Sequence, residues 1–324
     1  MRYHELVERF GTPELAWQRA PGLSDKAAAM EAAGAALERA AERGALVLLP
    51  GNADYPTALH DLPDPPAHLF ALGDPAMLRL PAVAIVGTRR ATPYGERVTR
   101  ELAGALARAG VTIVSGMARG IDGLAHRAAL DAGGRTVAVL GTGVDVPYPV
   151  AHRALHAEIA ERGLVLSEEL PGARATSGSF PKRNRLIAAL AQVTLVVEAP
   201  LRSGALITAS HALDLGRTVA AVPGPIDMPQ SAGSNELLRD GAMVIASTAD
   251  ALALFGCTLP LSRVAVPEGG PERAVWQALG EGALDLDTLT TRSALPAREC
   301  LAAVTALELS GAIECALTGE IRRR

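Results

Sequence analysis

The stretch AVAIVGTRRATPYGERVTRELAGALARAGVTIVSG, residues 82–116, decides the fold. It places a helical pattern with one apolar face (96–110) between two short β-branched runs, 82–87 and 111–116. Neither run alternates apolar with polar residues, so each is expected to be a strand buried on both faces. The same unit recurs downstream, with runs at 136–141, 164–168, 193–199, 218–224 and 242–247 and helical patterns at 121–132, 150–162, 183–191, 205–215 and 248–255. This alternation predicts an α/β fold with a doubly wound parallel sheet.

Shorter segments flank this block. Residues 1–44 show short helical patterns and turn signals, which predict a small helical domain. The Pro-rich residues 45–81 are expected to pack as an extended lead-in on the sheet edge, which gives an extended Rossmann-like domain over 45–256. Residues 257–271, rich in Pro and Gly, are expected to be a linker. Three helical patterns and a hairpin pattern over 272–324 predict a winged-helix domain.

The composition is that of a globular protein. Of 324 residues, 49% are hydrophobic and 20% are charged, which excludes general disorder. No apolar run approaches the roughly 18 residues of a membrane span, and the charged start MRYHELVERF lacks the apolar core of a signal peptide. The three cysteines form no CxxC pair, which argues against a disulfide framework or a zinc site. We therefore expect a cytoplasmic protein without a membrane partner.

The net charge of −4 argues against a nucleic-acid partner only at first sight. Residues 170–197 carry Arg174, Lys182, Arg183 and Arg185 and no acidic residue. Because salt screens exposed charges beyond about 10 Å, a local basic cluster can bind a polyanion even on an acidic protein.

Glycines gather where the predicted strands end. Four loops, Gly87–Gly95, Ser115–Asp122, Gly141–Asp145 and Glu198–Gly204, follow strands whose carboxyl ends meet at one edge of the sheet. Glycine allows main-chain N–H groups to face an anion at a helix N-terminus. The sequence therefore predicts a phosphate-binding rim; the plain alternative is that tight turns between strand and helix simply require glycine.

The segment SGSFPKRNR (177–185) is the sharpest signal of function. It surrounds Phe180 with polar and basic residues just before an apolar helix, in a chain with only 3% aromatic residues. This pattern predicts a platform on which a base stacks, with Lys182, Arg183 and Arg185 binding the flanking phosphates. The alternative is that Phe180 packs on the helix behind it while the arginines are solvated.

Catalytic and cofactor motifs are absent or incomplete. Gly141-Thr-Gly143 lacks the third glycine of the dinucleotide fingerprint, and the sequence has neither a GxxxxGK[ST] loop nor a GxSxG elbow. His152 and His156 stand i, i+4 without the Glu of a zinc protease. Asp122 and His126 fit a structural pair better than an acid–base pair. We therefore expect no catalytic residue, no metal and no cofactor.

Six motifs in order resemble the DNA-processing protein A family (DprA, also called Smf). They are IVGTRR (85–90), SGMARGIDGLAH (115–126), GTGVD (141–145) with Tyr148-Pro149, FPKRNRLI (180–187), SGALIT (203–208) and Pro223-Gly224 with GSNEL (233–237). The resemblance is dense from residue 45 to residue 250. The chain departs from it at Ser177, where some members carry lysine, and at His152, where asparagine is common.

This resemblance implies a cytosolic bacterial protein of natural transformation that binds incoming single-stranded DNA, forms a homodimer and loads the recombinase RecA, without catalytic activity. By motif match, it implies that Arg89, the aromatic Phe180, and Arg183 and Arg185 bind the strand. Together with the glycine loops and the basic segment, the expected strand-binding residues are Arg89, Arg90, Gly116, Arg119, Phe180, Lys182, Arg183, Asn184, Arg185, Ser203 and Gly204.

Two other functions stay open. Related enzymes with a Rossmann fold hydrolyse nucleoside monophosphates, which favours a nucleotide-processing enzyme. Their PGGxGTxxE signature is absent, however, because residues 198–206 read EAPLRSGAL at that position. A duplex-specific regulator would use the winged helix, but its recognition segment 296–309 offers only Arg298 against Glu299 and Glu308. Assays of base release from nucleotides, and gel shifts with single- and double-stranded DNA, separate these functions.

Overall fold

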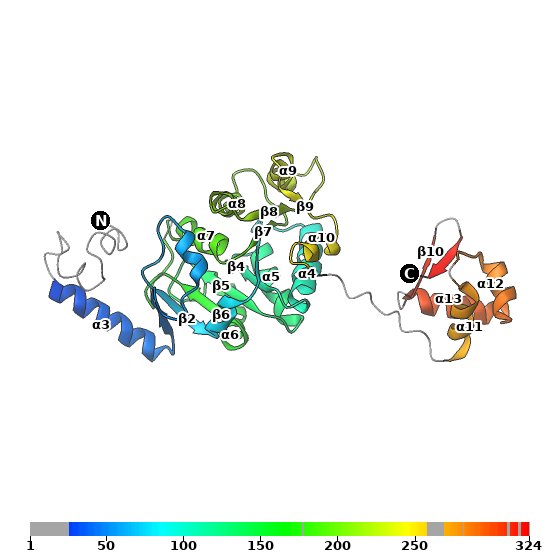
Figure 1. Cartoon of the computed structure of the whole chain (residues 1–324), viewed down its shortest axis with the longest axis horizontal. Coiled ribbons are helices and arrows are strands. Elements are labelled where there is room, and N and C mark those ends of the chain that lie inside the picture. Colours follow the sequence, from blue (N-terminus) through cyan, green and yellow to red (C-terminus); the bar gives the residue numbers. More distant parts are fainter. Residues whose placement is uncertain are drawn as a thin grey trace. The chain divides into compact units, whose positions relative to one another are not determined.

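The computed structural model describes residues 26–176, 178–257, 269–280, 282–309, 312–316 and 319–323. The chain divides into two compact units, residues 1–257 and 258–324, and each is described by itself (Figure 1). Three predictions fall wholly or mainly on residues outside this description: the first part of the helical domain at 1–44, Ser177, and most of the linker at 257–271. Of the helical domain, the structure describes α3 (Lys26–Glu42).

Among the described residues, a nine-stranded sheet forms the centre of the first unit, in the order β1-β2-β6-β5-β4-β3-β7-β8-β9 (Figure 1). The strands are β1 (Leu46–Leu48), β2 (Leu69–Gly73), β3 (Ala82–Val86), β4 (Thr112–Ser115), β5 (Thr136–Leu140), β6 (Leu164–Ser167), β7 (Val193–Val196), β8 (Thr218–Ala221) and β9 (Met243–Val244). Among the seven strands numbered β3 to β9, every pair of neighbours in the sheet is parallel. The predicted parallel sheet is confirmed, and each strand from β3 to β9 lies within one of the predicted β-branched runs.

The lead-in before β3 is itself part of the sheet. β2 pairs antiparallel with β6, with Phe70 opposite Ser167, and β1 pairs antiparallel with β2. The sheet is therefore mostly rather than wholly parallel. Short 3₁₀ helices, η1 (Thr57–Asp61) and η2 (Pro75–Arg79), lie in the same lead-in.

Helices cover both faces of the sheet. Along β3, Ala82, Ala84 and Val86 belong to one apolar core, and Val83 and Ile85 belong to another on the opposite face. The first core includes residues of α7 (Ser179–Ala189) and α8 (Gly204–Asp214); the second includes residues of α4 (Pro93–Arg108), α5 (Ile121–Asp131) and α10 (Thr248–Ala253). A third cluster joins α6 (Arg153–Arg162) to β2 and β6. The absence of alternation in the strands reflects this burial on both faces.

Two helices differ from the sequence prediction. α7 begins at Ser179 rather than at residue 183, so the whole SFPKRNR segment (179–185) is helical. α9 (Ala232–Arg239) was not predicted, because glycine and serine at Gly233 and Ser234 weaken its helical pattern. The short helices η3 (Val150–His152) and η4 (Pro229–Ser231) precede α6 and α9.

The strand order reverses between β3 and β7. From β3 the chain proceeds through β4, β5 and β6 on one side, and it then returns to β7 on the other side of β3. In such a sheet, the loops that leave the carboxyl ends of the two strands diverge, and a crevice opens between them. These loops contain Gly87–Arg90 and Pro200–Gly204, which the sequence assigned to the binding site.

The second unit consists of three helices and one strand pair among its described residues: α11 (Gly270–Leu279), α12 (Leu286–Ser293), α13 (Ala297–Leu309), β10 (Ile313–Cys315) and β11 (Ile321–Arg323). Val275, Leu289 and Val304, one from each helix, meet in its apolar core. This is the predicted winged-helix pattern. In neither unit is a described helix long and apolar enough to cross a membrane.

Candidate nucleic-acid interface

Two cavities open at the carboxyl ends of the strands. The arginine cavity, about 570 Å³, is lined by Arg89 and Arg90, residues of the 116–119 loop, the Tyr148–Ala151 segment, Phe180 and Arg183. The switch-point cavity, about 450 Å³, is lined by residues of the loops after β3 and β7 and of the first turns of α7 and α8. Five residues line both cavities and therefore lie between them: Arg89, Arg90, Ala118, Phe180 and Arg183.

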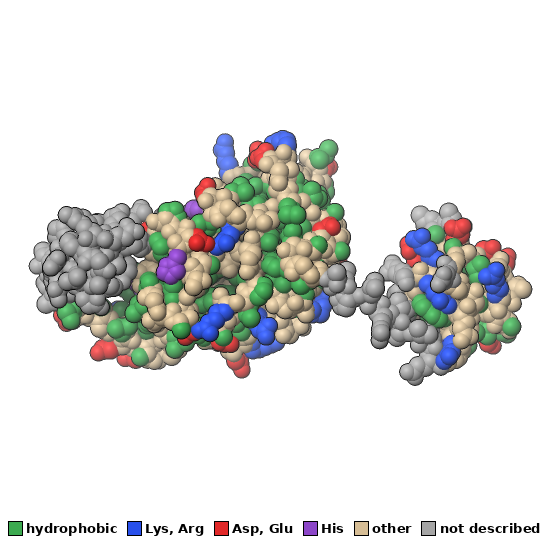
Figure 2. Space-filling model, in the orientation of Figure 1, with side chains coloured by type: hydrophobic (Ala, Val, Ile, Leu, Met, Phe, Trp, Pro, Cys, Tyr) green, Lys and Arg blue, Asp and Glu red, His purple; other side chains and the backbone are tan. Residues whose placement is uncertain are grey.

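The fold brings most of the predicted strand-binding residues together. The two cavities are lined by Arg89, Arg90, Gly116, Arg119, Phe180, Arg183, Asn184, Ser203 and Gly204. Lys182 and Arg185 line neither cavity. On the described part of the face shown in Figure 2, acidic and basic side chains are interspersed.

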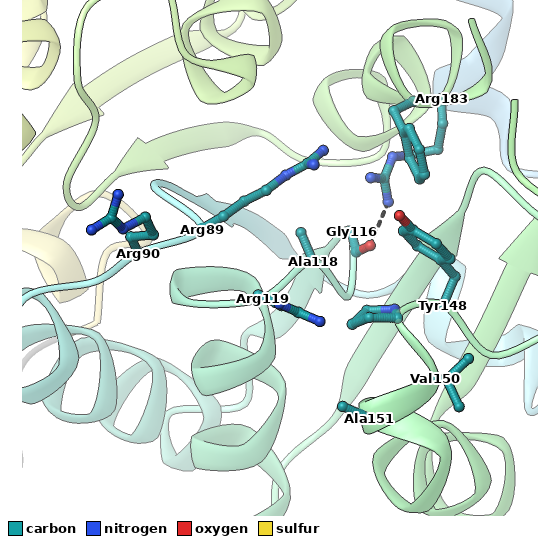
Figure 3. A pocket seen from close by; sticks show the side chains of 11 residues that line it. Arg89, Arg90, Gly116, Ala118, Arg119, Tyr148, Val150, Ala151 and Arg183 are labelled. Atoms are coloured by element: carbon teal, nitrogen blue, oxygen red, sulfur yellow. Dashed lines mark hydrogen bonds between the residues drawn. The ribbon is translucent and has the colours of Figure 1, made fainter. Parts of the chain in front are cut away.

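Three exposed arginines supply the positive charge. Arg89, Arg90 and Arg119 are all solvent-exposed at the ends of β3 and β4. Figure 3 shows Arg89 extending toward Arg183 across the cavity, whereas Arg90 points away from that pair. Asp122 is the one carboxylate among the residues that line the two cavities. The site therefore favours anions.

Two aromatic rings lie beside these cations. The Phe180 ring centroid is 5.1 Å from that of Tyr148, at an interplanar angle of 37°, and the Arg89 guanidinium carbon is 5.5 Å from the Phe180 centroid. Phe180 is half-buried and Tyr148 is exposed. The sequence analysis did not assign Tyr148 to the site. The available signal was a second aromatic residue, in a chain with few of them, after another glycine loop at the same sheet edge.

Arg183 differs from the other arginines because it is buried. Its Nη1 donates to Gly116 O at 2.6 Å and also to Val139 O, and the residue is only 6% exposed. Burial lowers the pKa of its guanidinium to about 10, and the nearby Asp122 carboxylate partly opposes that shift. The described hydrogen bonds of Arg183 thus go to main-chain carbonyls at the ends of β4 and β5.

The Asp122 carboxylate accepts hydrogen bonds from main-chain amides of the loop after β4. Its Oδ2 accepts from Gly116 N at 3.1 Å and from Ala118 N at 3.4 Å. Burial raises the pKa of this carboxyl, while Arg183 and the two amides lower it. A Cβ at residue 116 would collide with the Arg183 guanidinium. Glycine at this position therefore allows Arg183 to approach, and the Gly116 N–H faces Asp122 rather than an open anion site.

Lys182 and Arg185 form ion pairs on another side of α7. Arg185 Nη2 lies 2.6 Å from Glu168 Oε2, and Lys182 Nζ lies 3.4 Å from the same atom and 3.9 Å from Glu169 Oε1. Arg185 is largely buried, with 13% of its side chain exposed, whereas Lys182 is 50% exposed. These contacts join α7 to the end of β6.

The switch-point cavity carries uncharged polar groups at the N-terminus of α8. Asn184 is buried and donates from Nδ2 to Gly204 O at 3.1 Å. Ser203 is the N-cap residue, but its side chain makes no capping hydrogen bond, and its Oγ is shielded from solvent without a partner among the described residues. Main-chain N–H groups at a helix N-terminus favour an anion or a hydrogen-bond acceptor.

The titratable side chains near the cavities are engaged by the fold. His126 Nδ1 lies 2.7 Å from Thr136 Oγ1, while Asp122 binds main-chain amides, so each member of the expected structural pair has its own partner. His152 Nδ1 donates to Met117 O, and His156 Nε2 donates to Val144 O. The described residues contain no group of three or more His, Cys, Asp or Glu side chains that could hold a metal ion.

The first unit is thus a Rossmann-like domain with an arginine-lined crevice at its switch point, and the second is a winged helix. The chain belongs to the DNA recombination-mediator protein A family, whose domain matches residues 46–256. Residues 260–316 match the DprA winged helix domain. The family resemblance expected from the sequence is confirmed, and with it a role in DNA processing and recombination.

Relatives and solved structures agree with this assignment. The chain is 45% identical to a putative DNA processing protein DprA of Mycobacterium tuberculosis, over 77% of this chain and 67% of the relative. It is 37% identical to protein Smf of Escherichia coli, over 86% of this chain and 77% of the relative. The structure of DprA from Streptococcus pneumoniae matches with a TM-score of 0.62 at 41% identity, over 64% of this chain and 73% of that one. DNA processing protein A from Helicobacter pylori, whose structure concerns its single-stranded DNA binding mode, matches with a TM-score of 0.61 at 36% identity, over 65% of this chain and 96% of that one.

Proposed function

We propose that this chain is a single-stranded-DNA-binding recombination mediator. The observation that carries the proposal is the position of Arg89 beside Phe180, between two cavities at the switch point of the sheet. A guanidinium binds a phosphate through its planar fork, and an aromatic ring stacks on an unpaired base. The pair offers both partners that one nucleotide of a single strand requires.

A single strand fits this arrangement better than a duplex does. In a duplex the bases are stacked and paired, so their faces are not accessible to Phe180 or Tyr148. The exposed arginines Arg89, Arg90 and Arg119 would supply phosphate contacts that do not depend on sequence. The relative from Helicobacter pylori, whose structure concerns its single-stranded DNA binding mode, supports the same choice of ligand.

The proposed activity is binding without catalysis. The lining carboxylate, Asp122, accepts hydrogen bonds from two main-chain amides, which leaves it poorly placed to act as a general base. We therefore expect neither cleavage of DNA nor release of bases from nucleotides. Release of a free base from nucleoside monophosphates by the pure protein would instead support the nucleotide-processing alternative.

A bound strand becomes useful when it is passed on, and RecA is the recipient that the family resemblance implies. As the setting we propose the bacterial cytoplasm during natural transformation. A homodimer would help the transfer, since two linked grooves raise the effective concentration of the strand and keep it bound while one groove is vacated.

The β9 edge is the surface that best suits such a dimer. Among the described strands β9 is an edge strand, and its Met243 and Val244 side chains are exposed, as is Ile226 in the loop after β8. Light scattering should show a dimer for the wild type and a monomer for Met243→Asp. Leu46→Asp, an equally exposed apolar position on the opposite edge strand β1, is the matched control and should stay dimeric.

The mediator function is tested by RecA strand exchange on DNA coated with single-strand-binding protein. The wild-type protein should shorten the delay before exchange, whereas Arg89→Glu should not. Arg100→Glu makes the same charge change at an exposed position on α4 outside both cavities, and it should behave as wild type. Equal rates with wild type, with Arg89→Glu and without protein would reject the mediator function.

A further inference from the structure

Arg183 and Asp122 hydrogen-bond to the two main-chain polar groups of Gly116, its C=O and its N–H. The arginine donates to Gly116 O at 2.6 Å and to Val139 O, while the carboxylate accepts from Gly116 N at 3.1 Å and from Ala118 N at 3.4 Å. Each of the two charged residues is 6% exposed. This buried clamp joins α7 and α5 to the ends of β4 and β5.

The loop that the clamp holds is strained. Met117 has a φ of 56°, in the left-handed region that a residue with a Cβ avoids. Such a conformation persists only where the surrounding contacts enforce it. Besides the clamp, His152 Nδ1 donates to Met117 O at 3.0 Å. The loop conformation thus depends on side chains from three other segments.

The same loop supports the backbone of Arg89. Gly120, with a φ of 73°, lies so close to the loop after β3 that a Cβ would stand 2.8 Å from Arg89 C and 3.0 Å from Arg89 Cα. Next to it, Ile121 N donates to Thr88 O at 3.2 Å. The 116–120 loop therefore fixes the main chain from which the exposed Arg89 side chain projects.

Turning the Arg183 guanidinium away from its carbonyls and toward a phosphate would disrupt this arrangement. Its Nε is shielded from solvent without a partner among the described residues, and Nη1 is shared between two carbonyls. If the guanidinium turned to a phosphate, Gly116 O and Val139 O would lose their donor. The Asp122 carboxylate would also stay buried without its counter-charge, which proteins avoid.

We infer that Arg183 and Asp122 are positioning residues: they hold the 116–120 loop in the strained form that presents Arg89 to the strand, and Arg183 does not itself bind phosphate. This inference rests on the proposed single-strand binding and deepens it. It also revises the expectation from sequence, in which Arg183 was a phosphate contact.

The test compares conservative variants by two readouts, affinity for a labelled single-stranded oligonucleotide and the dependence of that affinity on salt. Arg183→Lys keeps the charge but loses the planar fork, and Asp122→Asn keeps the shape but weakens the acceptor. Arg217→Lys is the matched control, because Arg217 is also a partly buried arginine in an ion pair, with Asp61, but lines neither cavity and is not among the expected strand-binding residues. Affinities are expressed per folded protein, with folding checked by circular dichroism and thermal melting.

Arg183→Lys and Asp122→Asn should each lower the affinity of the folded protein by roughly tenfold. In each variant the 116–120 loop gains conformational freedom, and the entropy of ordering even one loop residue again must be paid when the strand binds. The slope of log affinity against log salt should stay at the wild-type value. Amide hydrogen exchange in the 116–120 loop should become faster. The double variant should be little worse than either single variant, because both act through one loop.

Other results would overturn the inference. A salt slope smaller in magnitude by about 0.7 for Arg183→Gln, which removes the charge, would show that Arg183 contacts a phosphate itself. A lower melting temperature with unchanged affinity would show a purely structural role. Gly120→Ala, which disturbs the loop without touching either charge, must also lose affinity with an unchanged slope. Failure of wild type to bind any single strand would reject the proposed function, whereas wild-type binding with normal Gly120→Ala binding would reject this inference alone.

Discussion

The guanidinium carbon of Arg89 lies 5.5 Å from the centroid of the Phe180 ring. An exposed cation–π contact of this kind stabilises by only about 0.5–1 kcal/mol, whereas stacking of a base on an aromatic ring contributes about 1–3 kcal/mol. The contact between Arg89 and Phe180 can therefore be replaced, at little cost in free energy, by a contact of Arg89 with a phosphate and of Phe180 with a base. This relationship leads to the predictions that follow.

Reversing the charge of Arg89 should remove most single-strand affinity. Arg89→Glu replaces an attraction to phosphate with a repulsion at the wall between the two cavities. Because Arg89 is exposed, the unfolding free energy should change by no more than about 0.5 kcal/mol. Fluorescence anisotropy and thermal melting measure the two effects. Normal binding by this variant would show that the site lies elsewhere.

Removing the Phe180 ring distinguishes a stacking platform from a core residue. Phe180→Ala should weaken single-strand binding by about 1–3 kcal/mol if the ring stacks on a base. If Phe180 is mainly a core residue, the same change should instead lower the unfolding free energy by about 3–5 kcal/mol. Its half-buried position beside Tyr148 favours the first outcome. A chemical denaturation curve measured beside a binding titration decides between them.

Tyr148 should contribute to the same binding surface. Its ring lies 5.1 Å from Phe180 and is exposed. Tyr148→Ala should therefore weaken binding of a thymine oligonucleotide, and it should have less effect on a strand that carries abasic sites, because no base remains to stack. An equal loss on both strands would mean that Tyr148 acts on the backbone or on the fold.

The salt dependence should report three phosphate contacts. Arg89, Arg90 and Arg119 are the exposed arginines that line the arginine cavity. At about −0.7 per contact for a single strand, they predict a log–log slope of about −2 for each protomer. Titrations at several salt concentrations give this slope, and Arg119→Gln should reduce its magnitude by one contact. A flat response would contradict binding through these arginines.

His126 should make the fold sensitive to acid. Thr136 Oγ1 donates to Ile113 O, so it accepts from His126 Nδ1–H; His126 Nε2 is buried without a partner among the described residues. Burial therefore lowers the pKa of this imidazole to about 3 in the folded protein. Because the folded pKa lies below the unfolded value of about 6.5, the stabilisation is present above pH ~6.5 and is lost as pH falls toward 3, by about 1.4 kcal/mol per pH unit.

The comparison with His126→Gln isolates this effect from the titration of carboxylates. The difference in unfolding free energy between wild type and variant should shrink from pH 7 to pH 4.5, as measured by urea denaturation at each pH. A difference that stays constant over this range would show that His126 is not responsible.

The sheet could be predicted because its signal is local. Runs such as 82–87 and 111–116 are apolar on both faces, and each is followed by a helix of suitable length. The antiparallel strands β1 and β2 could not be assigned in the same way. The edge strand β1 is short, flanked by Pro50 and partly exposed, and only the pairing of β2 with β6 makes the lead-in part of the sheet.

The direction of each arginine on α7 depended on where the helix begins. The predicted helix began at residue 183, and all the cations of segment 177–185 were expected to reach DNA. With α7 beginning at Ser179, Arg183 lies one turn before Leu186 and Ile187 on the buried side, whereas Lys182 is exposed. The glycine loops were correctly located, but the use of Gly116 to admit Arg183 depends on a tertiary contact.

The central claim is that Arg89 and its neighbours bind single-stranded DNA. The most direct measurement is a titration of one fluorescent oligonucleotide, single-stranded and annealed to its complement, with wild type, Arg89→Glu and Arg100→Glu at one salt concentration. We predict tight binding of the single strand and much weaker binding of the duplex by wild type and by Arg100→Glu, with little binding by Arg89→Glu. Equal affinity for single strand and duplex, or undiminished binding by Arg89→Glu, would contradict it.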